Sequence, residues 1–230
     1  MEKPSICSIK KHFTTSSIPT AEGVIIDLGT GDGRFVYQSA RENPNRFHIG
    51  IDASTSALEK ISEKVFRKPT KGGLSNVLFV QAAIEDLPPE LDGIADEVHV
   101  HFPWGSLLHA VASGDLVALQ GIRRMCAPDA LLEVLIGLDP ERDMSEFERL
   151  GLGPLTPEYV ADVLIPNYRV AGFEVIETGV LGRSEWPALE SSWGQKLKSG
   201  STNRSLIYLI ARAAESLTRS REEREEDHRC

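Results

Sequence analysis

The chain has 230 residues, of which 34 are acidic and 25 are basic, and its formal net charge is −9 at pH 7. Hydrophobic residues make up 41% of the sequence and charged residues 26%, which excludes collagen-like, coiled-coil and wholly disordered proteins. The acidic balance argues against a protein that coats nucleic acid by bulk charge, although a local basic patch remains compatible with it.

Short apolar runs alternate with longer amphipathic stretches along the chain. The predicted strands cover residues 24–28, 47–52, 77–80, 97–102, 130–136, 173–180 and 205–211. The predicted helices cover residues 33–42, from about 55 to before Pro69, 107–127 in two pieces broken near Ser113 and Gly114, and 159–171. Because strands and helices alternate along the chain, the pattern predicts an α/β protein. Its sheet should be doubly wound, mostly parallel and seven-stranded, with helices covering both faces.

The domain organisation follows from the same pattern. We expect a short N-terminal extension over residues 1–22, one α/β domain over 23–213, and a charged, disordered tail over 214–230. Two segments inside the domain, at about 140–158 and 182–204, are longer than typical connections and are predicted to be insertions. Long connections at strand ends commonly carry the functional site of an α/β protein.

Cysteine usage and the chain termini suggest a compartment. Cys7, Cys126 and Cys230 are scattered, odd in number and without metal-ligand spacing, which predicts neither a disulfide framework nor a metal site. No apolar run reaches about 18 residues, so no membrane span is expected. Residues 1–20 are polar and unlike a secretory signal. These features predict a cytoplasmic protein.

A glycine-rich loop follows the first predicted strand and opens a helix. Its glycines, Gly29 and Gly31 among them, follow a G-x-G-x-G pattern in which the third glycine comes one residue earlier than in dinucleotide-binding loops. Asp27 and Asp32 would repel phosphates and favour a cationic ligand such as S-adenosylmethionine. Asp52 ends the second strand, where a carboxylate can accept both ribose hydroxyls. The competing interpretation is a tight turn beside a surface aspartate.

Acidic residues also follow the third predicted strand. In a doubly wound sheet this strand end lies near the adenine of a bound nucleoside, where Glu85 or Asp86 could accept its amino hydrogens and the backbone of Ile84 could serve the ring. Capping of a short helix explains either acid equally well.

The fourth predicted strand ends in Phe102-Pro103-Trp104-Gly105. Backbone carbonyls next to a proline can accept from an exocyclic amine, and an aromatic face can stack on a base. The stretch resembles the (D/N)-P-P-(Y/F) motif of amine and adenine methyltransferases, with a tryptophan in the place of the stacking aromatic residue. The competing interpretation places Trp104 in the core at the end of a strand.

Four stretches of the chain resemble one family specifically. Residues 26–34, 68–76, 102–108 and 191–197 resemble the 16S rRNA (adenine(1408)-N1)-methyltransferases, the kanamycin–apramycin resistance enzymes, and the resemblance runs from about residue 23 to about 210. It implies a Rossmann-like class I S-adenosylmethionine-dependent fold. The Lys-Pro-x-x-Gly-Gly and Phe-Pro-Trp-Gly stretches discriminate better than the glycine loop, which many methyltransferases share.

The resemblance also implies roles for individual residues. The cofactor would be held by residues at the strand ends, namely Asp27, Gly29, Asp52, Ile84 and Glu85, with Gly31 in the same loop. Ser106 and Ser191 match positions that line the cofactor or target pocket. Trp104 and Trp193 would sandwich a flipped adenine, whose amino group would meet the backbone of Phe102 and Pro103.

A basic segment could dock on RNA. Residues 59–71 carry five basic and two acidic side chains, a net of +3, and the family match assigns rRNA phosphate contacts to Lys64, Arg67, Lys68 and Lys71. A solvated helix face is the competing interpretation. Arg204 is the one arginine where family members usually carry a cluster, and we expect it to contact RNA.

The chemistry agrees with this family. Adenine N1 has a neutral lone pair, so it can attack a sulfonium methyl without a general base, and the enzyme has to supply an extruded, oriented base. We therefore expect no catalytic histidine, and we predict that His99, His101 and His109 pack or lie at the surface.

The predicted function is methylation of N1 of adenine 1408 in 16S rRNA of the assembled 30S subunit by a monomer, conferring aminoglycoside resistance. Three alternatives remain at this point: a tRNA (guanine-N7) methyltransferase, a small-molecule methyltransferase, and a cofactor-binding homologue with little activity on the ribosome.

Overall fold

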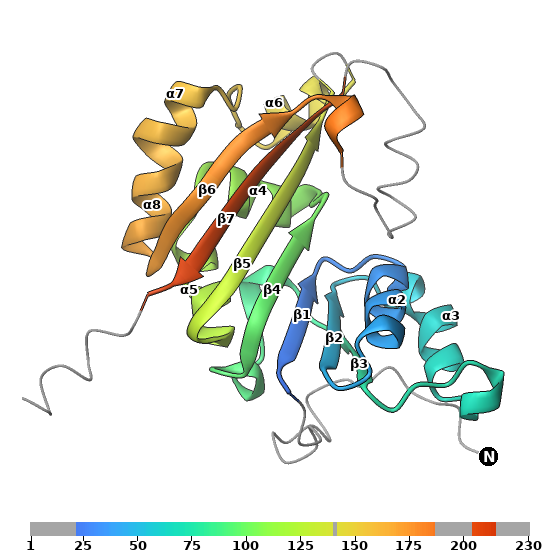
Figure 1. The fold of residues 1–230 in the computed structure, drawn as a ribbon. Helices are drawn as coiled ribbons and strands as arrows, with labels where there is room; N and C mark the ends of the chain where they lie inside the picture. The colour runs from blue at the N-terminus through green and yellow to red at the C-terminus, as the bar shows by residue number, and fades with distance from the viewer. Residues whose placement is uncertain (1–21, 140–141, 187–203, 215–230) are drawn as a thin grey trace, which may run out of the picture.

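The computed structural model describes residues 22–139, 142–186 and 204–214, and within them the chain forms one seven-stranded sheet in the order β3-β2-β1-β4-β5-β7-β6 (Figure 1). The strands are β1 (Val24–Leu28), β2 (Phe47–Asp52), β3 (Val77–Gln81), β4 (Ala95–His101), β5 (Cys126–Leu138), β6 (Phe173–Leu181) and β7 (Ser205–Ala213). Strands β1 to β5 pair in parallel, whereas β7 is antiparallel to both of its neighbours. The prediction of a mostly parallel seven-stranded sheet is confirmed.

Helices cover the two faces of the sheet unequally (Figure 1). Helices α2 (Arg34–Glu42) and α3 (Thr55–Val65) pack by β2 and β3, helices α4 (Gly105–Ser113) and α5 (Leu116–Met125) lie behind the sheet, and α8 (Ile165–Val170) lies next to the edge strand β6. The shorter elements are η2 (Pro69–Lys71), η3 (Ile84–Asp86), η4 (Pro89–Leu91), α6 (Met144–Arg149), α7 (Pro157–Tyr159), η5 (Val160–Leu164) and η6 (Arg183–Glu185).

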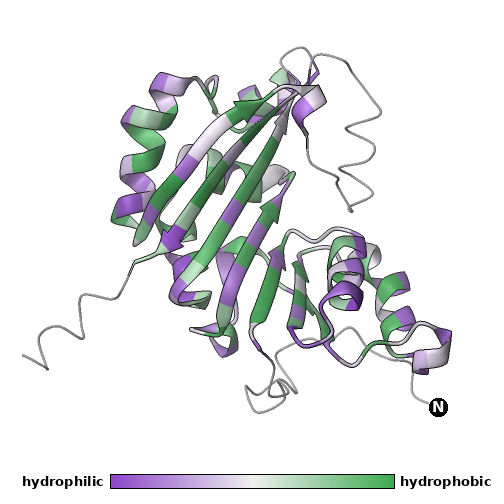
Figure 2. Ribbon diagram, viewed as in Figure 1, coloured by the Kyte–Doolittle hydropathy of each residue, from purple (hydrophilic) through white to green (hydrophobic). Residues whose placement is uncertain are grey.

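The strands are continuous apolar runs in the sequence because they are buried in the core. All five residues of β1 are buried, because a parallel strand between two helix layers has no solvent-facing side. The larger hydrophobic cluster joins β1, β4, β5 and β7 to α4, α5 and α8, and a smaller one joins α2 and α3 to β3. Figure 2 shows hydrophobic residues concentrated on the strands and hydrophilic residues on the outer sides of α2 and α3.

Two helical regions illustrate how local sequence sets the elements. The predicted break near residue 114 is confirmed: Gly114 ends α4 with φ +69°, and the Asp115 side chain accepts from the Ala118 N–H and starts α5. The helix predicted over 159–171 begins earlier, since the Thr156 hydroxyl accepts from the Tyr159 N–H. Its middle is the π-helical turn η5, directly before α8, where Pro166 has no N–H to donate.

Other elements differ from prediction in extent. Strand β5 starts at Cys126 rather than at residue 130, and the segment predicted as an insertion at 140–158 contains the short helix α6. Much of the second predicted insertion, residues 187–203, lies outside the described residues. Among the described helices, none has the length and apolarity needed to cross a bilayer.

The order of the strands places the functional crevice. Strands β2 and β3 lie on one side of β1, and β4 lies on the other, so the chain changes direction across the sheet between β1 and β4. At such a switch point the loops after adjacent strands diverge and leave a crevice at their carboxyl ends.

Candidate cofactor-binding and methyl-transfer site

A cavity of about 340 Å³ lies at this crevice. Four segments wall it: the β1–α2 loop, the end of β2, the segment after β3 and the end of β4. The sequence-predicted residues among its walls are Asp27, Gly29, Gly31, Asp52, Ile84, Phe102, Pro103, Trp104 and Ser106. Residues from four separate loops therefore meet in one place.

The glycine loop is fixed by hydrogen bonds to β2. The Gly29 N–H donates to the Ile51 carbonyl at 2.8 Å, and the Gly31 N–H donates to Asp52 Oδ2 at 2.8 Å. Gly29 has φ +78°, and a Cβ there would lie 2.6 Å from a methyl group of Leu107. A Cβ on Gly31, with φ +57°, would meet no protein atom, so this backbone is open to a ligand.

Asp52 has two tasks in this arrangement. Its Oδ1 accepts from the Ser54 N–H at 2.8 Å, and its Oδ2 holds Gly31, so the carboxylate orients the loop while facing the cavity. Each carboxylate oxygen has a second lone pair, which leaves acceptors for the ribose hydroxyls of a nucleoside.

Asp27 gives the inner wall its acidity. It is 4% exposed, and burial raises its pKa, although the charges of His101 and His99 act in the opposite direction. A buried carboxylate beside an open cavity is compensated by a cationic group, which fits the ammonium and sulfonium groups of S-adenosylmethionine.

The adenine side is only partly as predicted. Ile84 is buried and lines the cavity, as expected, whereas Glu85 is exposed and is not among the lining residues. Ser106, at the start of α4, lines the cavity near the end of β4.

The end of β4 turns sharply at Phe102. This residue has φ +52°, its N–H donates to the Leu135 carbonyl at 2.7 Å, and its ring stacks on that of buried Trp186 with centroids 6.0 Å apart. A left-handed conformation in a non-glycine residue is strained and persists where packing enforces it. The turn leaves Trp104 51% exposed at the cavity edge, which contradicts the interpretation of Trp104 as a core residue.

A second cavity, of about 410 Å³, shares Phe102, Pro103 and Trp104 with the first. Its other walls are Gly137, Arg142, Asp143 and Arg204. The Phe-Pro-Trp turn therefore borders both cavities, whereas the glycine loop lines only the first.

Arg204 lies in this wall rather than in an RNA-facing patch. It is 8% exposed, and its guanidinium donates to Asp143 at 2.6 Å and to the Gly137 carbonyl at 2.9 Å. This buried ion pair ties the start of β7 to the segment after β5. The expectation that Arg204 contacts RNA does not agree with this placement, because phosphate contacts require an exposed side chain.

The basic segment does form an exposed surface at the end of α3 and in η2. Arg67, Lys68 and Lys71 are exposed, and Lys64 places its Nζ 3.8 Å from the ring centroid of Tyr37. Their phosphate contacts remain a prediction. Trp193 and Ser191 lie outside the described residues.

Two of the histidines predicted to pack or lie at the surface, His99 and His101, pack against Phe35 and also contact a shared acid. His101 lines the cofactor cavity, and both His101 and His99 bond to Glu133 of β5. Burial lowers the pKa of His99, but hydrogen bonds to Glu133 and Glu97 outweigh it and raise the pKa to about 9. The alternation of residues 97–102 puts both rings on one face of the strand and was the signal available in the sequence.

Together, the switch-point cavity, the acidic glycine loop and the Asp52 carboxylate that orients this loop are the arrangement of a class I S-adenosylmethionine-dependent methyltransferase. The family model for 16S rRNA (adenine(1408)-N(1))-methyltransferase matches residues 5–212. The chain belongs to this family, as the sequence resemblance predicted.

Individual relatives agree with this assignment. The 16S rRNA (adenine(1408)-N(1))-methyltransferase of Streptoalloteichus hindustanus is 39% identical over 177 residues, which cover 76% of this chain and 80% of the relative. The crystal structure of the aminoglycoside resistance methyltransferase NpmB1 is 46% identical, with a TM-score of 0.78 over 88% of this chain and 95% of that one. A Catenulisporales acidiphilia relative solved with the cosubstrate SAM is 32% identical, with a TM-score of 0.78 over 88% and 90% of the two chains.

Proposed function

We propose that this protein transfers a methyl group from S-adenosylmethionine to N1 of adenine 1408 in 16S rRNA of the assembled 30S subunit and thereby confers aminoglycoside resistance. The observation that carries the proposal is the position of Trp104, half exposed at the turn that separates the cofactor cavity from the second cavity. Membership of the family supports the choice of adenine 1408 over a tRNA or small-molecule target.

Methylation of adenine N1 does not need a general acid or base from the protein. S-adenosylmethionine, when bound, supplies an electrophilic methyl group on a positively charged sulfur. Adenine N1 attacks with its neutral lone pair, and no proton has to leave that nitrogen, so the protein contributes orientation and exclusion of water.

The residues at the end of β4 perform this orientation. The carbonyls of Phe102 and Pro103 accept from the adenine amino group and fix the rotation of the base, and the indole of Trp104 stacks on one face of it. The family resemblance assigns the opposite face of the base to Trp193, which lies outside the described residues. Extrusion of the base costs a few kcal/mol of lost stacking in the RNA, and these contacts offset that cost.

Recognition of the ribosome falls to the basic segment. Arg67, Lys68 and Lys71 are exposed next to one another and can contact phosphates without base specificity. Because the whole chain carries −9, such binding depends on the shape of the folded subunit rather than on bulk charge. The protein acts as a cytoplasmic monomer on assembled subunits.

The test is a methylation assay with labelled S-adenosylmethionine on 30S subunits, free 16S rRNA and tRNA side by side. We expect labelling of 30S subunits and a primer-extension stop at adenine 1408, with little label in tRNA. Label in tRNA alone, or the absence of any stop despite measured cofactor binding, contradicts the proposal.

A matched pair of variants separates chemistry from folding. Trp104→Ala removes the stacking face, while Trp104→Phe keeps an aromatic ring at the same exposed position. We expect the alanine variant to bind the cofactor normally and to methylate about 5- to 150-fold less than wild type, because it loses one stacking face, and we expect the phenylalanine variant to retain most activity.

A further inference from the structure

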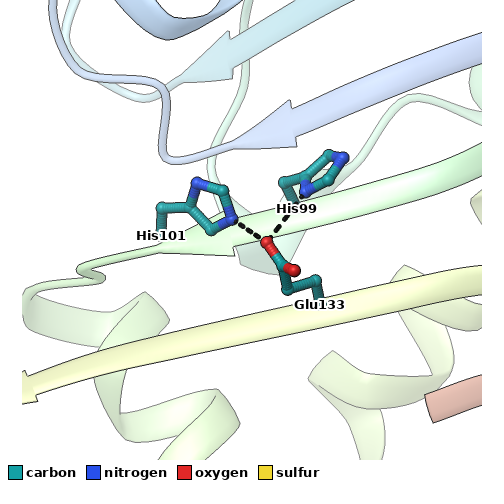
Figure 3. A group of neighbouring side chains, drawn as sticks. All are labelled: His99, His101 and Glu133. Carbon is teal, nitrogen blue, oxygen red and sulfur yellow. Dashed lines mark hydrogen bonds and ion pairs between the residues drawn. The ribbon is translucent and has the colours of Figure 1, made fainter. Parts of the chain in front are cut away.

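Three potential metal ligands meet on two neighbouring strands beside the cofactor cavity (Figure 3). His99 and His101 are two residues apart on β4, so both rings project from the same face of the sheet. Glu133 lies directly across from His99 on β5 in the parallel register. The three side chains point toward one another in Figure 3.

Their donor atoms are close enough to share one ion. Glu133 Oε1 lies 2.5 Å from His101 Nε2 and 3.3 Å from His99 Nδ1, and one ligand atom from each residue falls within a group spanning 4.8 Å. Zinc–nitrogen and zinc–oxygen bonds are about 2.0–2.2 Å, so ligand atoms around one zinc ion lie about 3.3 Å apart. Small movements of the partly exposed Glu133 side chain and of the two imidazoles would bring the present donor-atom separations to those around a zinc ion.

The outer contacts match those of metal-binding histidines. His99 Nε2, on the ring side away from Glu133, lies 3.4 Å from Glu97 Oε2, and Glu97 is held by Arg46 at 2.5 Å. Asp27, on the neighbouring strand β1, is close enough to both histidines to interact with their charge. A ligating imidazole usually donates its other N–H to a carboxylate, which fixes the ring and raises its basicity as a ligand.

Burial and packing also suit a metal site. The side chains of His99 and His101 are 17% and 12% exposed, whereas that of Glu133 is 35% exposed. The ring of Phe35 packs edge-on against both imidazoles, with centroids 5.5 and 4.9 Å away. Two fixed nitrogens and one accessible carboxylate leave positions open to water on the Glu133 side.

We propose that His99, His101 and Glu133 form a binding site for a divalent transition-metal ion, with Zn²⁺ as the best match. Two imidazole nitrogens and one carboxylate are a ligand set that zinc takes with water in the fourth position. The ion takes the place of the contacts between Glu133 and the two histidines, and ligation requires neutral imidazoles and an ionised carboxylate. The site joins β4 to β5 next to the cofactor cavity, whose wall includes His101.

The test is titration of tag-free, metal-stripped full-length protein with Zn²⁺ by calorimetry and with Co²⁺ by visible absorption. We expect one equivalent of Zn²⁺ to bind and Co²⁺ to give visible bands without the intense near-ultraviolet absorption of cysteine ligands. Zn²⁺ should also raise the melting temperature, because an ion that binds only the folded state stabilises it.

Two ligand variants and two further variants make the assignment specific. Glu133→Gln and His99→Gln keep side-chain size and should each weaken Zn²⁺ binding by at least about 100-fold, while Glu97→Gln, which acts through His99, should weaken it about 10- to 100-fold. His109→Gln, a histidine outside the cluster, should leave binding unchanged.

The results that support the proposal differ clearly from those that overturn it. Folding of each variant is checked by its melting curve without metal, so a lost fold is not mistaken for a lost ligand. Absence of a one-equivalent Zn²⁺ site in the wild type, or equal Zn²⁺ affinity in Glu133→Gln, His99→Gln and wild type, overturns the proposal and leaves the cluster as an ion-pair network only.

Discussion

Two cavities meet at the Phe102–Trp104 turn, and they are built in different ways. The residues that line the first cavity, the proposed cofactor cavity, all lie between residues 27 and 107. The second cavity depends on Arg142, Asp143 and Arg204, which come from the far part of the chain, and on a buried ion pair between the last two of these.

This difference indicates that the two cavities depend on different parts of the chain. The residues that line the first cavity come from β1, β2, β3, β4 and the segments that follow them. The second cavity also uses segments after β5 and before β7, where the Arg204–Asp143 ion pair joins two strand ends. We therefore expect changes to the first cavity to affect cofactor affinity, and changes to the second to affect stability and target methylation.

The largest expected effect tests the second cavity. Arg204→Met leaves Asp143 charged and buried, and loss of one partner of a buried ion pair costs about 3–5 kcal/mol of unfolding free energy. Urea unfolding measures this. Replacing both residues, Arg204→Met with Asp143→Leu, should recover most of the loss, because no unpaired charge remains.

A matched surface pair is the control for that experiment. The Arg124–Asp92 pair is 3.8 Å apart, with side chains 54% and 42% exposed. Arg124→Met should cost less than about 1 kcal/mol. Equal losses for Arg124→Met and Arg204→Met would mean that the Arg204–Asp143 pair is not what holds this cavity together.

The next effect tests the cofactor cavity. Asp52→Ala removes the acceptor of the Gly31 and Ser54 N–H groups and, on the proposed function, the acceptor of two ribose hydroxyls. The two hydrogen bonds to the ribose, at about 1.5 kcal/mol each because the acceptor is charged, predict about 100-fold weaker cofactor binding. Calorimetry with S-adenosylhomocysteine measures it. Glu85→Ala, on an exposed side chain outside the cavity walls, should change affinity little.

Trp104→Ala tests the boundary between the cavities. Loss of one stacking face costs about 1–3 kcal/mol, so methylation of 30S subunits should fall about 5- to 150-fold at unchanged cofactor affinity. Single-turnover methylation and cofactor calorimetry on the same preparation separate the two quantities. A parallel fall in cofactor affinity would assign Trp104 to the first cavity rather than to the target.

The smallest effect concerns the basic segment. If Arg67 contacts a phosphate, Arg67→Ala should reduce the slope of log affinity against log salt concentration by about 0.7–0.9. Binding of 30S subunits over a range of salt concentrations measures this slope. Arg41→Ala, on an exposed position of α2, is the control and should leave the slope unchanged.

Much of the fold was predictable because its signals are local. The apolar runs of β1 and β2 announce buried strands, and Gly114 with Asp115 marks the break between two helices within a few residues. The start of β5 was placed late, since Asp129 has φ +62° inside that strand and residues 126–129 follow no strand alternation.

The site residues likewise divide into those that local sequence patterns indicate and those that they do not. Asp27, Gly31 and Asp52 were predictable because a glycine loop after a strand and an acid at the next strand end are short-range patterns. Glu85 was chosen from its place after β3, and the structure leaves it outside the cavity because the backbone turns at η3 and buries Ile84 instead.

The sequence by itself determined the alternation of strands and helices, the acidic glycine loop and the family, because each depends on residues close together in the chain. Only the tertiary structure decided that Arg204 pairs with Asp143, 61 residues away, and that His101 meets Glu133, 32 residues away. Such contacts arise when β5 takes its place between β4 and β7, and no spacing within either strand specifies which side chain will lie opposite.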